Sequence, residues 1–155
     1  MSNSEMKQRL HDDMTAALKA RDEIRKSTLR MALTAVTKAE VAGKEARELS
    51  DAEVLEVLGA EAKKRRESVT AYREAGRAEL ADKEQAEADI LAEYLPEQLT
   101  AEEIAALVTE TIAATGAAEL GPRGIGKVMG ALQPKVKGKA DGGAVSAEVK
   151  RQLAG

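Results

Sequence analysis

The stretch Tyr94-Leu95-Pro96-Glu97-Gln98-Leu99-Thr100-Ala101-Glu102-Glu103 divides a chain whose pattern is otherwise helical. Proline disfavours the helical conformation for the residue before it, so a helix that approaches Pro96 must end there. Thr100 and Glu103 then have the spacing of a capping box, in which each side chain accepts a hydrogen bond from the other residue's backbone N–H. We therefore expect one helical domain over residues 1–95 and a second over residues 96–155.

Helical patterning extends in both directions from this break. Ser50 and Glu53 have the spacing of another capping box, Asp22 is a candidate N-cap, and apolar residues recur every three or four positions. The second helix, for example, has an apolar stripe that we expect to face the core: Ile24, Leu29, Leu33, Val36 and Val41. The predicted helices cover residues 4–20, 22–42, 50–75, 78–94, 100–116 and 122–132, with a last one that is capped by Ser146 or begins slightly earlier, at Val145.

No segment supplies the β-branched and aromatic run that a strand needs, and aromatic residues make up 1% of the chain. The predicted fold class is therefore all-α, with a four-helix N-terminal domain and a three-helix C-terminal domain.

Composition excludes several kinds of chemistry. The chain has no cysteine and one histidine, His11, so disulfides, thiol nucleophiles, Cys-based zinc sites and His-rich metal sites are all excluded. The carboxylates are plentiful, but helical spacing puts most of them on outer faces, including a strongly acidic face from Glu79 to Glu93. Glu61 is the most inward-looking and can pair with Arg65 one turn later. We predict no catalytic residues, no metal site and no cofactor.

The first residues lack the apolar core of a signal peptide, and no apolar stretch approaches the roughly 20 residues that span a bilayer. We expect a soluble, cytoplasmic protein without a membrane partner.

Charge is unevenly distributed along the chain. Residues 75–120 carry two basic and eleven acidic residues, whereas residues 121–155 carry seven basic and two acidic ones. The stretch from Gly121 to Lys139 contains no acid at all. A basic, glycine-rich surface of this kind is typical of contact with a phosphate backbone. The predicted RNA-binding residues are Arg123, Gly126, Lys127, Gly130, Lys135, Lys137 and Lys139.

Alternatives remain for this stretch. It can be a solvated loop between two short helices, and Gly126 and Gly130 can serve a close approach by another helix rather than by RNA. Gly121 to Lys127 also has the glycine and lysine spacing of a phosphate-binding P-loop, but Val128 stands where a magnesium-binding hydroxyl is needed and no strand precedes it. We therefore reject nucleotide hydrolysis. Another basic run, Lys63 to Arg66, points around most of a helix, so at least one of its stems must lie against the core.

Several segments together resemble the GatB/YqeY family over nearly the whole chain. They are Arg25-Lys26-Ser27-Thr28-Leu29-Arg30-Met31, Lys64-Arg65-Arg66-Glu67-Ser68 with Tyr72 and Gly76-Arg77, Tyr94-Leu95-Pro96-Glu97-Gln98-Leu99, Gly126-Lys127-Val128-Met129 and Val136-Lys137-Gly138-Lys139-Ala140-Asp141-Gly142. The C-terminal half resembles the tail domain of the B subunit of tRNA-dependent amidotransferases, which are carbon–nitrogen ligases with glutamine as amide donor. The resemblance implies a small helical tail that meets tRNA outside a catalytic centre.

The catalytic cradle of those amidotransferases has no counterpart in this sequence. The leading hypothesis is therefore a non-catalytic RNA-binding protein that contacts tRNA, or another structured RNA, by backbone and shape. The alternative is an accessory or protein-interaction module that docks on an amidotransferase or another helical partner, and a third class is an amide-transfer enzyme. A continuous positive face would favour RNA, whereas an exposed groove of aliphatic residues would favour a protein partner.

Overall fold

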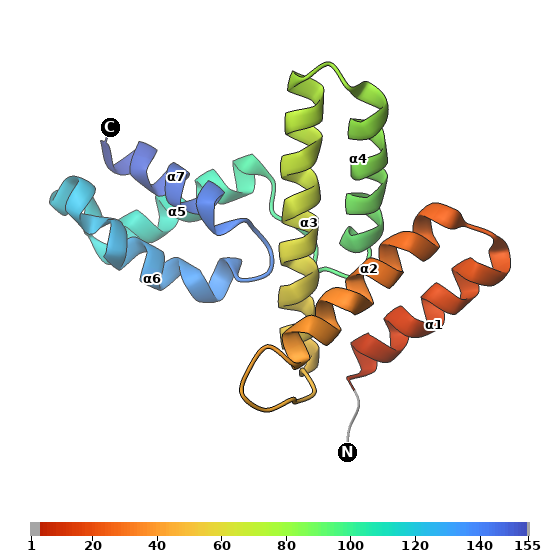
Figure 1. The fold of residues 1–155 in the computed structure, drawn as a ribbon. Coiled ribbons are helices and arrows are strands. Elements are labelled where there is room, and N and C mark those ends of the chain that lie inside the picture. Colours follow the sequence, from red (N-terminus) through yellow and green to blue (C-terminus); the bar gives the residue numbers. More distant parts are fainter. Residues whose placement is uncertain (1–3, 155) are drawn as a thin grey trace. The chain divides into compact units, whose positions relative to one another are not determined.

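The computed structural model describes residues 4–154, and all the regular structure in that range is helical (Figure 1). It contains seven α-helices and one 3-10 helix, with no strand among these residues. The chain divides into two compact units, residues 1–95 and residues 96–155.

The N-terminal unit consists of two helical hairpins that share one core. Helices α1 (Glu5–Ala20) and α2 (Glu23–Glu40) lie side by side, as do α3 (Asp51–Glu74) and α4 (Ala78–Ala92) (Figure 1). Their shared core is aliphatic, with one aromatic ring: Leu10, Leu29, Val36, Val54, Leu58, Leu91 and Tyr94. Tyr94 is also held at its polar edge, because its hydroxyl donates to Asp13 and the Arg9 guanidinium lies 4.4 Å from its ring centroid.

Local capping signals are confirmed in this unit. Ser4 and Asp22 accept backbone N–H groups at the starts of α1 and α2, and Ser50 and Glu53 make the predicted reciprocal capping box at the start of α3. The second helix is shorter than the predicted range 22–42, since α2 ends at Glu40 and the next residues form an exposed loop.

Two of the residues predicted to face the core from α2 lie outside it. Ile24 is 46% exposed and Val41 is 59% exposed, whereas the buried face is formed by Thr28, Leu29, Ala32 and Val36. The prediction is confirmed for Leu29 and Val36, which are fully buried, and for Leu33, which packs against the core, and it is wrong for the residues near the two ends of the helix.

The most buried charges of the N-terminal unit form one cluster between α3 and α4. Arg65 is 6% exposed; its Nε lies 3.3 Å from an oxygen of Glu87, and its Nη1 lies 3.4 Å from an oxygen of Glu61. This confirms that one stem of the basic run turns inward and that Glu61 pairs with Arg65. The assignment of Glu87 to the outer acidic face is wrong, since Glu87 is buried against Arg65.

The C-terminal unit packs helices α5 (Ala101–Thr115), α6 (Ile125–Val136) and α7 (Gly142–Ala154) around a second core, with the 3-10 helix η1 (Ala117–Gly124) between α5 and α6. The fully buried side chains of this core are Val108, Val128, Leu132, Val145 and Val149. The capping box of Thr100 and Glu103 starts α5, and Gly116 ends it in the left-handed conformation, as predicted. Gly124 has no room for a side chain, because a Cβ would lie 2.9 Å from the carbonyl oxygen of Ala117.

The boundaries of the last two helices differ from the prediction. The chain is a 3-10 helix at Pro122, α6 begins only at Ile125, and α6 then continues through Pro134 to Val136. Val136 is buried, and burial of a valine contributes about 1.5–3 kcal/mol, which offsets the hydrogen bond that Pro134 cannot make. Helix α7 likewise begins at Gly142 instead of Ser146, leaving a short connection where a longer loop was expected.

Candidate nucleic-acid interface

Acidic residues predominate in the first part of the C-terminal unit, and basic residues predominate from Arg123 onward. Residues 96–155 carry seven acidic and seven basic residues, so the unit is close to neutral as a whole. Five of the seven acidic residues lie between Glu97 and Glu119, whereas every basic residue lies at or after Arg123. The basic residues up to Lys139 therefore belong to α6 and its two flanks.

All seven residues predicted to bind RNA are exposed on this segment. Arg123 lies at the end of η1, Gly126, Lys127 and Gly130 lie in the first half of α6, and Lys135 lies in its last turn. Lys137 and Lys139 follow in the turn after the helix. The buried face of α6, formed by Val128, Leu132 and Val136, fixes which side of the helix remains outside.

Most of these cations lack an intramolecular counterion. Among residues 4–154, the side chains of Arg123, Lys127, Lys135 and Lys139 make no hydrogen bond or ion pair. The N-terminal unit differs, because many of its bases are matched with acids. The pairs there include Lys7–Glu40, Arg9–Asp13, Arg25–Glu93, Lys26–Glu23, Arg47–Glu53, Lys64–Glu61, Arg65–Glu87 and Arg73–Asp82.

Lys127 stands where a cation weakens its own helix. It lies in the first turn of α6, which contains no acid and has no side-chain N-cap. A positive charge near a helix N-terminus is unfavourable by about 0.3–1 kcal/mol. Helix stability therefore does not explain why a lysine stands there.

Gly126 and Gly130 are also unexplained by the packing of the unit. A Cβ built on either glycine would meet nothing within 4 Å, and neither residue has a positive φ. Each glycine weakens the helix by about 0.5–1 kcal/mol relative to alanine. No helix of the C-terminal unit uses the bare backbone for a close approach, so both positions remain open to a partner from outside.

The turn after α6 is held from the other end of the unit. Leu99 donates its backbone N–H to the carbonyl of Lys139 at 2.8 Å, and the Gln98 side-chain amide donates to the carbonyl of Gly138 at 2.9 Å. Gly138 itself has a φ of +76°, a conformation that favours glycine. Sequence reasoning missed Gln98 as a supporting residue of the basic turn, because the contact joins residues 40 positions apart.

The arrangement offers exposed binding groups on α6 and its two flanks. Within residues 4–154, no group of three or more His, Asp or Glu side chains is placed to hold a metal ion. The glycine- and lysine-containing segment Gly121 to Lys127 forms 3-10 helix and the first turn of α6, not the strand–loop–helix of a P-loop. In the same described part of the chain, no single helix is long and apolar enough to cross a membrane.

Comparison with known families places this chain beside one of them. A family model described as Yqey-like protein matches residues 7–153. No curated protein in the comparison is similar enough to match.

Proposed function

The chain belongs to the YqeY-like protein family, and from that premise we propose that it binds RNA through the phosphate backbone, with transfer RNA as its first candidate ligand. The surface that does so is the outer side of α6 and its two flanks, with Arg123, Lys127, Lys135, Lys137 and Lys139 supplying charge. Gly126 and Gly130 let the ribose–phosphate chain approach the helix backbone.

One observation carries this proposal: the outer side of α6 holds two lysines, Lys127 and Lys135, and two glycines, Gly126 and Gly130, that the fold itself does not use. Its lone cations have no acidic partner among the described residues, and its two glycines make no close contact. Each of these features lowers or fails to raise stability, so selection for an external anionic ligand is the simplest physical reason for them. The charge is arranged along roughly 12 Å of helix between Lys127 and Lys135, which suits an extended polyanion better than a single small anion.

Recognition is proposed to depend on shape and charge instead of base stacking. The chain has two aromatic residues, Tyr72 and Tyr94, and both belong to the N-terminal unit, where the Tyr94 ring is buried. Stacking platforms for bases therefore do not belong to this surface, and backbone and 2′-hydroxyl contacts would dominate. The choice of tRNA rests on the resemblance of the C-terminal half to the amidotransferase B-subunit tail.

The proposal includes no chemistry by this chain alone. We further propose that the four-helix N-terminal unit and the three-helix, tail-like C-terminal unit are two domains of a cytoplasmic binding protein. An amide-transfer role would then need an amidotransferase that supplies the catalytic centre.

Salt dependence of binding tests the proposal. A tRNA transcript would be titrated with the parent protein and with a Lys135→Gln, Lys137→Gln, Lys139→Gln variant at several salt concentrations. We expect the parent to show a steep fall in affinity with salt, and the variant to bind more weakly with a slope reduced by about 2–3, because each phosphate contact contributes roughly 0.7–0.9 to the slope.

A matched control removes the same charge from the other unit. Lys19, Arg66 and Lys83 are exposed, and their side chains have no partner among residues 4–154. Replacing these three with Gln should leave the slope unchanged, as should Glu79→Gln on the acidic side of α4. If the tail variant binds tRNA as tightly as the parent at every salt concentration, the basic segment is only a solvated loop.

A further inference from the structure

A row of exposed residues runs along α2 on the side away from the core of the N-terminal unit. Ile24 and Met31 are each 46% exposed and Val41 is 59% exposed, with Thr34 and Lys38 exposed between them. Helical spacing places Ile24, Met31, Thr34 and Lys38 on one side of α2, and Val41 follows directly after the end of the helix. Since α2 also buries Leu29, Ala32 and Val36 on its inner side, it is apolar on two sides. We call the outer row, with the grooves beside it, the α2 surface.

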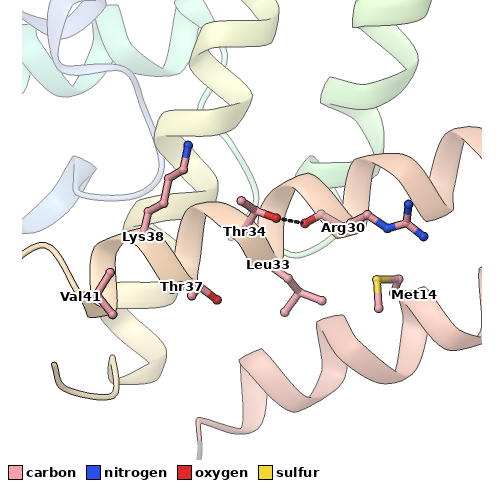
Figure 2. A pocket seen from close by; sticks show the side chains of 7 residues that line it. All are labelled: Met14, Arg30, Leu33, Thr34, Thr37, Lys38 and Val41. Atoms are coloured by element: carbon pink, nitrogen blue, oxygen red, sulfur yellow. Dashed lines mark hydrogen bonds between the residues drawn. The ribbon is translucent and has the colours of Figure 1, made fainter.

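Two grooves flank this row. The first lies on the α1 side, has a volume of about 340 Å³, and is lined by Met14, Leu33, Thr37 and Val41. Figure 2 shows Met14 and Leu33 pointing into the space between α1 and α2, with Lys38 on the opposite edge of the helix. The second groove, of about 480 Å³, lies between α2 and α3 and includes Met31, Ala35, Val57 and Ala60. Thr34 and Lys38 line both grooves, so the two form one surface that straddles α2.

The charge of the α2 surface is positive. Arg30 and Lys38 line the α1-side groove, and neither side chain has a partner among residues 4–154. No described residue that lines this groove carries a carboxylate. The carboxylate that lines the second groove belongs to Glu61, which is held by Lys64 at 3.0 Å and by Arg65 at 3.4 Å.

We propose that the α2 surface docks an amphipathic helix of a partner protein, one whose apolar stripe is flanked by carboxylates. The apolar lining of the grooves would take the stripe, in the manner of helix-in-groove recognition. The flexible side chains of Met14 and Met31 adapt to such a stripe. The unpaired charges of Arg30 and Lys38 would meet the flanking acids, which gives the interface its selectivity.

The other occupants fit this surface less well. A second copy in a two-fold dimer would bring Arg30 and Lys38 of both copies to the same interface, where like charges repel. RNA would find three cations among the residues that line the grooves, but Lys64 is paired with Glu61 at 3.0 Å, and the methionine, leucine and valine side chains beside the cations offer a phosphate backbone no hydrogen bond. The α2 surface and the basic side of α6 thus serve partners of different chemistry.

Charge reversal tests this docking site. The probes are two synthetic peptides of about 18 residues with the same leucine stripe, one flanked by Glu and the other by Lys. We expect the Glu peptide to shift the methyl NMR signals of Met31, Leu33 and Val41 in the full-length protein. The Arg30→Glu, Lys38→Glu variant should reverse the preference between the peptides by about tenfold, because two attractive pairs become repulsive.

The control makes the same change in net charge elsewhere. A Lys19→Glu, Lys83→Glu variant should keep the parent's preference for the Glu peptide. The proposal is overturned if the Glu peptide binds with a Kd above about 1 mM, if both peptides bind alike, or if the control reverses the preference too. Concentration-dependent dimerisation that Val41→Asp abolishes would assign the surface to a second copy, and displacement of the Glu peptide by tRNA would assign it to RNA.

Discussion

Gln98 holds Gly138 across 40 positions of sequence: its side-chain amide donates to the Gly138 carbonyl at 2.9 Å and to the Pro96 carbonyl at 2.7 Å. Leu99 adds a backbone bond to Lys139 at 2.8 Å. The segment that begins the C-terminal unit therefore sets the path of the turn that carries Lys137 and Lys139.

Removal of the Gln98 amide should separate positioning from charge. In Gln98→Ala, we expect RNA affinity to fall by up to about tenfold, the equivalent of one lost hydrogen bond, while the salt slope stays as in the parent. Backbone amide NMR shifts of Gly138 and Lys139 should move in the free protein. Gln85→Ala, which removes an exposed side-chain bond to Asp89 in the N-terminal unit, is the control. A reduced salt slope in Gln98→Ala would contradict a purely positioning role.

Filling the two open glycines should raise stability while it lowers RNA binding. Gly126→Ala and Gly130→Ala should each stabilise the protein by about 0.5–1 kcal/mol, because the added methyl group meets no neighbour in the unit. The same methyl groups would hold a ribose–phosphate chain away from α6 and weaken binding. Thermal unfolding and tRNA titration of each variant measure the two effects.

Gly59 provides the matched control for this experiment. It lies inside α3 with no atom within 4 Å of a built Cβ, so Gly59→Ala should give a similar gain in stability. It should not affect RNA binding. Glycine variants in α6 that gain stability and bind tRNA like the parent would show that the open backbone has no role in binding.

The ion cluster around Arg65 should be sensitive to the loss of its cation. Arg65→Met should lower the free energy of unfolding by about 3–5 kcal/mol, because the Glu87 carboxylate stays buried without its partner. Adding Glu87→Gln should recover part of the loss, on the order of 1 kcal/mol or more. The exposed neighbour Arg66→Met should stay within about 0.5 kcal/mol of the parent. Denaturant unfolding checks all three, and purely additive effects would exclude coupling between Arg65 and Glu87.

The start of α3 should contribute to the loss of stability in acid. The hydrogen bond from Arg47 and then that from the Ser50 backbone lower the pKa of Glu53 from 4.5 to about 2. A lowered pKa means that the folded state binds the proton less readily than the unfolded state, so the contribution is complete above about pH 4.5 and lost as the pH falls towards 2.

Glu53→Gln should therefore flatten the dependence of unfolding free energy on pH in this range, since glutamine keeps the cap but does not titrate. Thermal unfolding over a pH series would measure the slope. Glu103→Gln changes the corresponding capping box of α5 without removing an arginine pair, and its slope should stay closer to the parent's. Equal slopes for the Glu53 variant and the parent would contradict the assignment.

Local chemistry of the sequence determined the helices and several of their ends. The capping boxes at Ser50 and Thr100 and the left-handed Gly116 involve contacts within one turn, so short spacings were enough to predict them. The basic segment from Arg123 to Lys139 could also be identified from the sequence, because it contains five basic residues within a short stretch and no acidic residue.

Packing between helices decided the rest. It turned Arg65 and Glu87 inward, left Ile24 and Val41 outside, and carried α6 through Pro134 to bury Val136. Helical periodicity gives the direction of an apolar stripe but not which neighbours cover it, and the contact of Gln98 with Gly138 depends on helices that are distant in sequence. These features depend on contacts between helices that are far apart in the sequence, so no single segment determines them.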